Sequence, residues 1–399
     1  MTKTKYDFDT PVDRRGTGAT LYEEMEMKFG RTDLTPLWIA DMGFAVCPEI
    51  TEALRRRLDN PVFGYTTPTA EFWDSIMGWM KRRHGLSLRR EELDFVPGVK
   101  KGIGLMINYF TKPGDKILIQ PPVYHSFHSL ISGNNRVAVH NPLVRRGDDY
   151  LMDLEALEET CRRERPVMML FCNPHNPVGM QWGLDIVRAV AKICQRYGII
   201  LISDEIYGDM MLTDKPHIPT LCSCPEAEEV TITIGAPSKT FNIPGFAAAW
   251  VAIRNPELRD GFFKWLLTSE FNTPPMEAII AAQAAYTYAE DWLDQLLPYL
   301  RDNALHAVER LNAMEGVHAI MPESGFCVWT DFAGLGLTHA QVMDLMADGA
   351  GLAVSSGVTF GDGGEGFIRL NTGVARCELD AALDCIERAV NNFHHNKKK

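Results

Sequence analysis

The sequence predicts an α/β fold with a mostly parallel central sheet and helices on both of its faces. Short apolar runs alternate with amphipathic segments: residues 166–172 and 198–203 flank a segment with one apolar helical face, formed by Ile186, Val190, Ile193 and Tyr197. This alternation is typical of parallel strands joined by crossover helices. Turn-rich motifs follow several of these runs, and in a parallel sheet the loops after the strands form the ligand site.

Length and charge limit the classes of function. A chain of 399 residues can form one large and one smaller domain, and its net charge of −12 argues against nucleic acid or an anionic membrane as main partner. The first ten residues lack the apolar segment of a signal peptide, and no later apolar run is long enough to span a bilayer. We therefore expect a cytoplasmic protein with no membrane partner, whose nine scattered cysteines are reduced.

The character of the sequence changes near residue 290, which predicts two domains and two flanking parts. The large domain is expected at 47–289, and a smaller α/β domain at 290–392 begins and ends with a long helix. Residues 1–46 are expected to pack with the smaller domain, and the basic end of the chain, 393–399, to be disordered.

The first part of the chain holds a possible strand, a helical region and a loop. Read alone, Trp38 to Met42 would be a buried strand with one acidic residue. Cys47 to His84 has a helical pattern, interrupted by the turn-rich loop 63–69. Tyr65 lies in this loop, where a tyrosine usually serves as half-buried packing.

A short strand then ends at Pro97–Gly98, and an amphipathic helix begins near Val99. The start of a helix offers unpaired backbone N–H groups and the positive end of the helix dipole, which together commonly hold a phosphate. Gly98, Val99 and Lys100 are the candidate phosphate cradle. The glycine pattern alone is weak, because many strand-to-helix turns contain one.

Residues 116–131 predict a strand, a double-proline turn and a helix that begins near Tyr124. His125 and His128 lie three residues apart and could ligate a metal in principle. No cluster of carboxylates or cysteines accompanies them in the sequence, so we expect no metal site.

The strongest candidate site lies in residues 231–245, where alternating β-branched residues end at Gly235 and Pro237, just before Ser238 and Lys239. A lysine sheltered from water loses hydration of its charged form, so its pKa falls and its amine becomes a nucleophile. Asp204 ends another apolar run, and a carboxylate there is costly unless it meets a positive partner.

Pyridoxal 5′-phosphate (PLP) requires a lysine that forms a Schiff base, an acid that keeps its ring nitrogen protonated, and anchors for its phosphate. Lys239 and Asp204 match the first two requirements. Four ordered motifs resemble the signature of fold-type I, aminotransferase-class PLP enzymes: NPHNPVG (173–179), SDEIY (203–207), SKTFNIPG (238–245) and FIRLNTG (367–373). The resemblance implies PLP as cofactor and the corresponding α/β fold.

The same resemblance implies roles for further residues. Tyr124 would stack on the cofactor ring, and Asn176 and Tyr207 would donate hydrogen bonds to its phenolic oxygen. Arg369 would bind the substrate carboxylate in a bidentate manner, with Asn176 and Tyr124 also at the substrate site. The catalytic residues would be Lys239, Asp204 and Tyr207. Tyr65 would reach the cofactor phosphate of a neighbouring subunit, which implies a homodimer.

The N-terminal motifs YDFDTPVDRRGTGA (6–19) and PLWIADMGF (36–44) resemble the MalY/PatB-type carbon–sulfur β-lyases. This branch usually has an acidic residue at the position of Gly43 and a Lys-Trp-Asp run where the chain has Leu21-Tyr22-Glu23. These departures leave the substrate open.

The phosphate site also departs from the family pattern. Relatives commonly have a serine at the position of Ala236 and a basic residue at that of Ala247. The phosphate would then depend on backbone N–H groups, Ser238, Tyr65 and Lys100, and the sequence does not decide the effect on cofactor affinity.

Two activities fit these residues, and both begin with removal of the Cα proton of the substrate. In a β-lyase acting on cystathionine, cystine or a cysteine conjugate, a thiol leaves and pyruvate and ammonia result; in an aminotransferase, a 2-oxo acid accepts the amino group. The catalytic residues serve both, and the N-terminal resemblance favours the lyase. A non-catalytic binding or regulatory protein is disfavoured because Lys239, Asp204 and Arg369 are all present. The side chain of the substrate is not decided.

Overall fold

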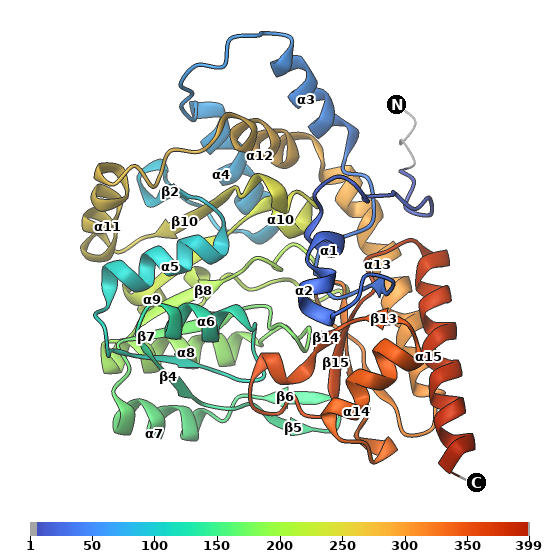
Figure 1. Cartoon of the computed structure of the whole chain (residues 1–399). Coiled ribbons are helices and arrows are strands. Elements are labelled where there is room, and N and C mark those ends of the chain that lie inside the picture. Colours follow the sequence, from blue (N-terminus) through green and yellow to red (C-terminus); the bar gives the residue numbers. More distant parts are fainter. Residues whose placement is uncertain (1–5, 398–399) are drawn as a thin grey trace. The chain divides into compact units, whose positions relative to one another are not determined.

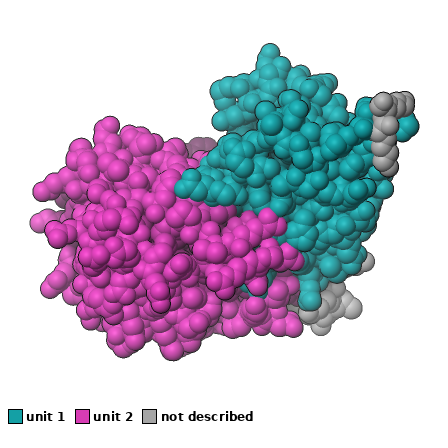
Figure 2. All heavy atoms as spheres, turned by 90° about the horizontal axis from the view of Figure 1, so that it is seen from below, with its two compact units in different colours: residues 1–45, 177–179, 295–399 teal, residues 46–176, 180–294 magenta. Residues whose placement is uncertain are grey.

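The structure, a computed structural model, describes residues 6–397 and divides into two compact units (Figures 1 and 2). The small unit contains the described residues of 1–45, 177–179 and 295–399, and the large unit contains 46–176 and 180–294. The domain boundaries expected after residues 46, 289 and 392 stay predictions.

The large unit is built on a seven-stranded sheet with the order β2-β10-β9-β8-β7-β3-β4. β10 is antiparallel to both of its neighbours, and every other pair of adjacent strands is parallel. Six strands therefore end at the same edge, and the predicted α/β fold with a mostly parallel sheet is confirmed. The strands are β2 (Leu93–Val96), β3 (Lys116–Ile119), β4 (Val137–His140), β7 (Met168–Cys172), β8 (Ile200–Asp204), β9 (Thr231–Gly235) and β10 (Ala249–Ile253).

Helices connect these strands and begin where the sequence provides a start. Four of them have proline in the first turn, and α7 begins after Asp153, whose carboxylate accepts the Ala156 N–H at 2.9 Å. The hairpin β5 (Val144–Arg146) and β6 (Asp149–Leu151) precedes α7. The helices are α3 (Pro48–Leu58), α4 (Ala70–His84), α5 (Val99–Phe110), α6 (Ser126–Gly133), α7 (Leu154–Glu164), α8 (Leu184–Tyr197), α9 (Pro225–Val230), α10 (Pro237–Thr240), α11 (Pro256–Thr268) and α12 (Met276–Tyr288).

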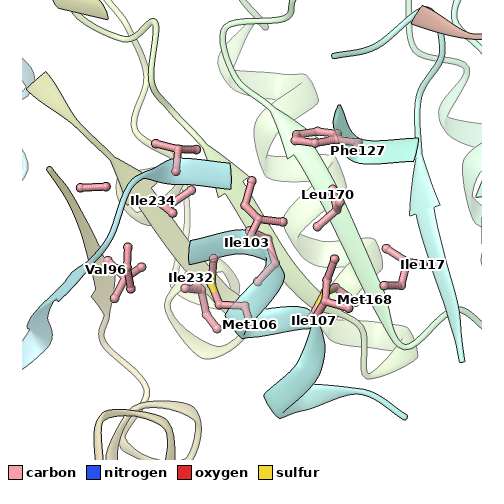
Figure 3. Close-up of a cluster of buried hydrophobic side chains, with 14 of the residues drawn as sticks. Val96, Ile103, Met106, Ile107, Ile117, Phe127, Met168, Leu170, Ile232 and Ile234 are labelled. Carbon is pink, nitrogen blue, oxygen red and sulfur yellow. The ribbon is translucent and has the colours of Figure 1, made fainter. Parts of the chain in front are cut away.

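The main apolar core lies between one face of this sheet and the helices α5, α6 and α11. Figure 3 shows Ile103, Met106 and Ile107 of α5 beside strand residues such as Ile232 and Ile234. The strand residues of this core alternate along each strand, because successive side chains of a strand point to opposite faces. Burial of these large side chains provides most of the energy that fixes the sheet.

The small unit is built on a four-stranded sheet with the order β11-β12-β15-β14 and on a parallel pair of β1 with β13. The helix α13 (Glu290–Asn312) begins in the large unit and continues into the small one. The remaining elements are α1 (Thr20–Glu23), α2 (Met25–Phe29), β1 (Thr35–Pro36), β11 (His318–Ile320), β12 (Cys327–Asp331), α14 (His339–Asp344), β13 (Leu352–Ala353), β14 (Ser355–Ser356), β15 (Phe367–Asn371) and α15 (Arg376–Lys397).

The expectation of a strand at 38–42 is wrong, since β1 ends at Pro36. The side-chain amide of Asn371 donates to the carbonyl groups of Ile39, at 2.8 Å, and Asp41, at 2.7 Å. Side-chain hydrogen bonds thus replace the ladder that a neighbouring strand would provide.

The end of the chain also differs from the expected disorder. α15 includes residues 393–397, while 398–399 lie outside the described residues. His394 contacts the backbone carbonyl of Glu315 at 2.9 Å, and the Lys397 ammonium lies 5.6 Å from the ring centre of Phe393. These contacts extend the helix beyond its predicted end.

Candidate active site

The carboxyl edge of the seven-stranded sheet brings together strand ends that are far apart in the sequence. Cys172 at the end of β7 is paired in register with Asp204 at the end of β8, and Asp204 is paired with Ile234 of β9. The predicted residues follow these ends closely: Tyr124 after β3, Asn176 after β7, Tyr207 after β8 and Lys239 after β9. This is the edge at which parallel sheets bind ligands.

Asp204 is almost completely buried, with 2% of its surface exposed. Its Oδ1 accepts the backbone N–H of Ile206 at 3.2 Å. Burial raises the pKa of Asp204 to about 7, against the effect of the Ile206 hydrogen bond; the charge of Glu205 raises it further, and that of Lys239 lowers it. A second positive charge, beside that of Lys239, would therefore stabilise the ionised carboxylate, and a protonated ring nitrogen would provide one.

Lys239 is half-buried and lies in the short helix α10, which begins directly after β9. Gly235 ends β9 under the indole of Trp250, and a Cβ there would come within 2.3 Å of that ring. On the other side of the lysine, Phe241 packs against Trp79 and Tyr286 with ring centres 5.2 and 5.7 Å away. The lysine thus stands between two tightly packed neighbours.

A second carboxylate, which sequence reasoning missed, lies beside α10. Asp209 Oδ2 accepts the hydroxyl of Thr240 at 2.8 Å, and Oδ1 accepts Trp79 Nε1–H at 2.9 Å and His84 Nε2 at 2.6 Å. One signal for it is present in the sequence, because Asp209 follows the motif at 203–207 by two residues. Its partners at 79 and 84 are too distant in the sequence to be recognised.

The phosphate cradle expected at 98–100 forms the start of α5. Gly98 is the N-cap residue with φ of 93°, a conformation that favours glycine, and its missing Cβ would come 3.5 Å from the Cβ of Ala247. Val99 is buried and Lys100 is exposed. The first turn of this helix therefore offers backbone N–H groups beside a small side chain, which suits an anion.

The remaining predicted residues differ in exposure. Ser238, Asn176 and Tyr207 are buried and Tyr124 is partly exposed, whereas Tyr65 is fully exposed within this chain. The structure places Tyr65 in the segment between α3 and α4. Its predicted role requires a second copy of the chain.

Arg369 belongs to the small unit, where it lies on β15 with 3% of its surface exposed. Its Nη2 lies 3.4 Å from the Trp38 carbonyl and from the Ser355 hydroxyl, and its guanidinium lies 5.0 Å from the ring centre of Phe360. These neighbours hold the planar guanidinium in one orientation, as bidentate binding of a carboxylate requires.

Comparison with known families places most of the chain in one of them. The family model described as aminotransferase class I and II matches residues 32–386. The chain belongs to this family. Members of known structure support the same fold: cystalysin from Treponema denticola, which contains a PLP cofactor, matches with a TM-score of 0.93 and 30% identity over 98% of this chain and 100% of its own.

Two curated members of the family are similar over nearly their whole length. Cystathionine beta-lyase PatB of Bacillus subtilis is 35% identical over 96% of this chain and 100% of its own. Protein MalY of Escherichia coli is 32% identical over 96% of this chain and 99% of its own. The resemblance to the MalY/PatB branch is confirmed.

The residues of the site fit PLP, the cofactor of this aminotransferase-class enzyme. A buried carboxylate with a raised pKa matches a ring nitrogen that carries a proton, and Lys239 is close enough for its charge to act on that carboxylate. Among residues 6–397, no group of three or more His, Cys, Asp or Glu side chains is placed to hold a metal ion. None of the helices in that part of the chain could cross a membrane.

Proposed function

We propose that this enzyme is a PLP-dependent carbon–sulfur β-lyase, which converts L-cystathionine, cystine or a cysteine conjugate into pyruvate, ammonia and a thiol. The observation that carries the proposal is the similarity to cystathionine beta-lyase PatB, at 35% identity over 96% of this chain. The motifs at 6–19 and 36–44 support the same branch. The reaction consumes one water for each carbon–sulfur bond that is broken.

Each proposed residue has a defined task in this reaction. Bound PLP supplies an aldehyde that takes up the substrate amino group and a ring that accepts electrons from Cα. The amine of Lys239 removes the Cα proton as a general base, and the electron pair then expels the sulfur from Cβ as a thiolate, which is protonated. Asp204 keeps a proton on the ring nitrogen, and Arg369 holds the substrate carboxylate.

The other residues of the site serve the cofactor. Asn176 and Tyr207 donate hydrogen bonds to its phenolic oxygen, and Tyr124 stacks on its ring. The phosphate binds at Gly98, Val99 and Lys100, with Ser238 beside them. The positive end of α5 and the small side chain of Ala247 at 3.5 Å from the Gly98 position support this assignment.

We further propose a cytoplasmic homodimer in which Tyr65 reaches the phosphate of the partner's cofactor. The exposure of several large apolar side chains in one stretch supports an interface there; they are Leu58, Val62, Phe63 and Tyr65. Light scattering of the purified enzyme tests the dimer, and a monomer at micromolar concentration would contradict it. Tyr65→Phe is expected to weaken PLP binding in an equilibrium titration.

A product assay tests the proposed reaction. The purified, PLP-loaded enzyme is incubated with L-cystathionine, and pyruvate and free thiol are followed with and without an added 2-oxo acid. The lyase releases both products without the oxo acid. Turnover that occurs only when the oxo acid is present would make the enzyme an aminotransferase, the alternative activity that the same catalytic residues would serve.

A further inference from the structure

A cluster of buried polar groups beside α10 has no task in the proposed reaction. It joins the end of α10 to the end of α4 through Asp209, which accepts hydrogen bonds from Thr240 (2.8 Å), Trp79 (2.9 Å) and His84 (2.6 Å). The side chains of Asp209 and His84 are only 10% and 7% exposed. Thr240 is the residue next to Lys239.

The carboxylate of Asp209 is ionised at neutral pH. Burial alone would favour its neutral form, but the hydrogen bond from His84, the charge of His84 and the bonds from Thr240 and Trp79 hold the pKa of Asp209 below its ordinary value. Hydrogen bonds to an ionised acceptor are about twice as strong as those between neutral groups. The Thr240 hydroxyl therefore has a strong and fixed partner.

A second contact fixes the same end of α10. The ring of Phe241, the residue after Thr240, packs edge-on against Trp79 with ring centres 5.2 Å apart. Trp79 thus contacts both the carboxylate and the aromatic neighbour. A helix of four residues does not hold its own shape in water, so these contacts determine where α10 and its side chains lie.

We infer that Asp209 is a positioning residue for Lys239. Through Thr240 it holds α10 in place, so that the amine of Lys239 stays within reach of the cofactor aldehyde and of the substrate Cα proton. The inference rests on the proposed function, because it takes Lys239 as the reacting lysine. Asp209 itself contacts neither cofactor nor substrate in this account.

A positioning role for Asp209 should affect the rate of reaction but not substrate binding. Loss of the Thr240 bond allows the lysine to occupy several positions, and a displacement of about 1 Å costs up to roughly a hundredfold in rate. Substrate affinity depends on other groups, so KM should change little while kcat falls. A purely structural role would instead lower thermal stability and leave the kinetics of the folded enzyme unchanged.

The test compares Thr240→Val, which removes the hydroxyl at nearly constant shape, with Thr240→Ser, which keeps it. PLP is added to each cofactor-free protein, and the rate at which the visible absorbance band forms is followed by stopped flow. Thr240→Val is expected to form the band about tenfold more slowly than wild type, with a similar fall in kcat. Thr240→Ser should stay within about twofold and keep the wild-type thermal midpoint. Thr240→Val should also lower the midpoint by a few degrees, so its kinetics are measured well below that temperature.

Wild-type rates in Thr240→Val, or equal losses in both variants, would overturn the inference. Asp209→Ala, which removes both acceptor oxygens, gives an independent check: adding Thr240→Val to it should cause no further slowing, because both changes remove the same bond. Additive losses in this double variant would contradict the shared role. A different result would contradict the proposed function itself: wild-type protein that forms no visible absorbance band and no Schiff base at Lys239 that borohydride can reduce.

Discussion

Two carboxylates in the same region, Asp204 and Asp209, respond to burial in opposite ways. Asp204 accepts one backbone N–H, and burial raises its pKa to about 7. Asp209 accepts three side-chain hydrogen bonds, and these outweigh burial and lower its pKa. This difference supports the proposal that Asp204 meets a ligand, whereas the hydrogen bonds of Asp209 are made within the protein.

The two faces of the sheet show the same contrast. Ile202 of β8 belongs to the apolar core, two residues before Asp204. The adjacent Ser203 donates to Glu205 at 2.8 Å, and Glu205 also contacts His217 at 3.0 Å, all of them buried. Because side chains alternate along a strand, one face provides an apolar setting for the ligand acid and the other a closed polar network.

The largest expected effect comes from removing the ligand acid. Asp204→Ala should lower kcat by roughly 10²–10³-fold, because the ring nitrogen loses the group that keeps it protonated. Steady-state kinetics of the PLP-loaded variant measure this. Near-normal turnover would show that another carboxylate fulfils this task.

The buried cation of the small unit should have the next largest effect. Arg369→Lys keeps the charge but loses the bidentate fork, so kcat/KM should fall about ten- to a hundredfold, mainly through KM. Arg376→Lys serves as a matched control. Arg376 lies at the start of α15, and its Nε–H donates to the side chain of Asn303 at 2.8 Å. If Arg369→Lys leaves KM unchanged, the arginine does not bind the carboxylate.

The opposite pKa shifts predict opposite effects on the stability of the cofactor-free protein. Because the folded-state pKa of Asp204 is raised from 3.8 to about 7, stability is lost as pH rises between these values. Asp204→Asn should remove this loss and raise the thermal midpoint at pH 8 by a few degrees.

Asp209→Asn should instead lower that midpoint by a few degrees at pH 8. The stability that Asp209 contributes through its lowered pKa is present above the unfolded value and is lost as pH falls through the folded one. Calorimetric scans of both variants from pH 4 to 8 measure the contrast. If both variants shifted the thermal midpoint in the same direction at pH 8, the predicted difference between the two carboxylates would be wrong.

The smallest effect is expected at Thr233 on β9, which is paired in register with Ser203. Its buried hydroxyl oxygen has no hydrogen-bond partner among the described residues. Thr233→Val should therefore stabilise the protein by about 1 kcal/mol, measured by urea unfolding, without changing activity. A clear loss of stability would reveal that the hydroxyl takes part in the polar network.

Most of the sheet was predictable because its strands are continuous apolar runs followed by turn residues, as at 168–172 and 200–204. Asp204 was recognisable because it ends such a run, and Lys239 because it follows the alternating β-branched residues of β9. The backbone at 38–42 was not, since the carbonyl groups of Ile39 and Asp41 are bound by the side chain of Asn371. Asp209 was missed because its hydrogen-bond partners lie on α4 and α10, and tertiary packing alone brings them to it.

Chemical trapping of the cofactor tests whether Lys239 is the lysine that binds PLP. The PLP-loaded enzyme is reduced with borohydride and digested, and the modified peptide is identified by mass spectrometry. We expect one PLP-modified lysine, Lys239, and no visible absorbance band in Lys239→Ala. Modification of another lysine, or a band that persists in Lys239→Ala, would contradict it.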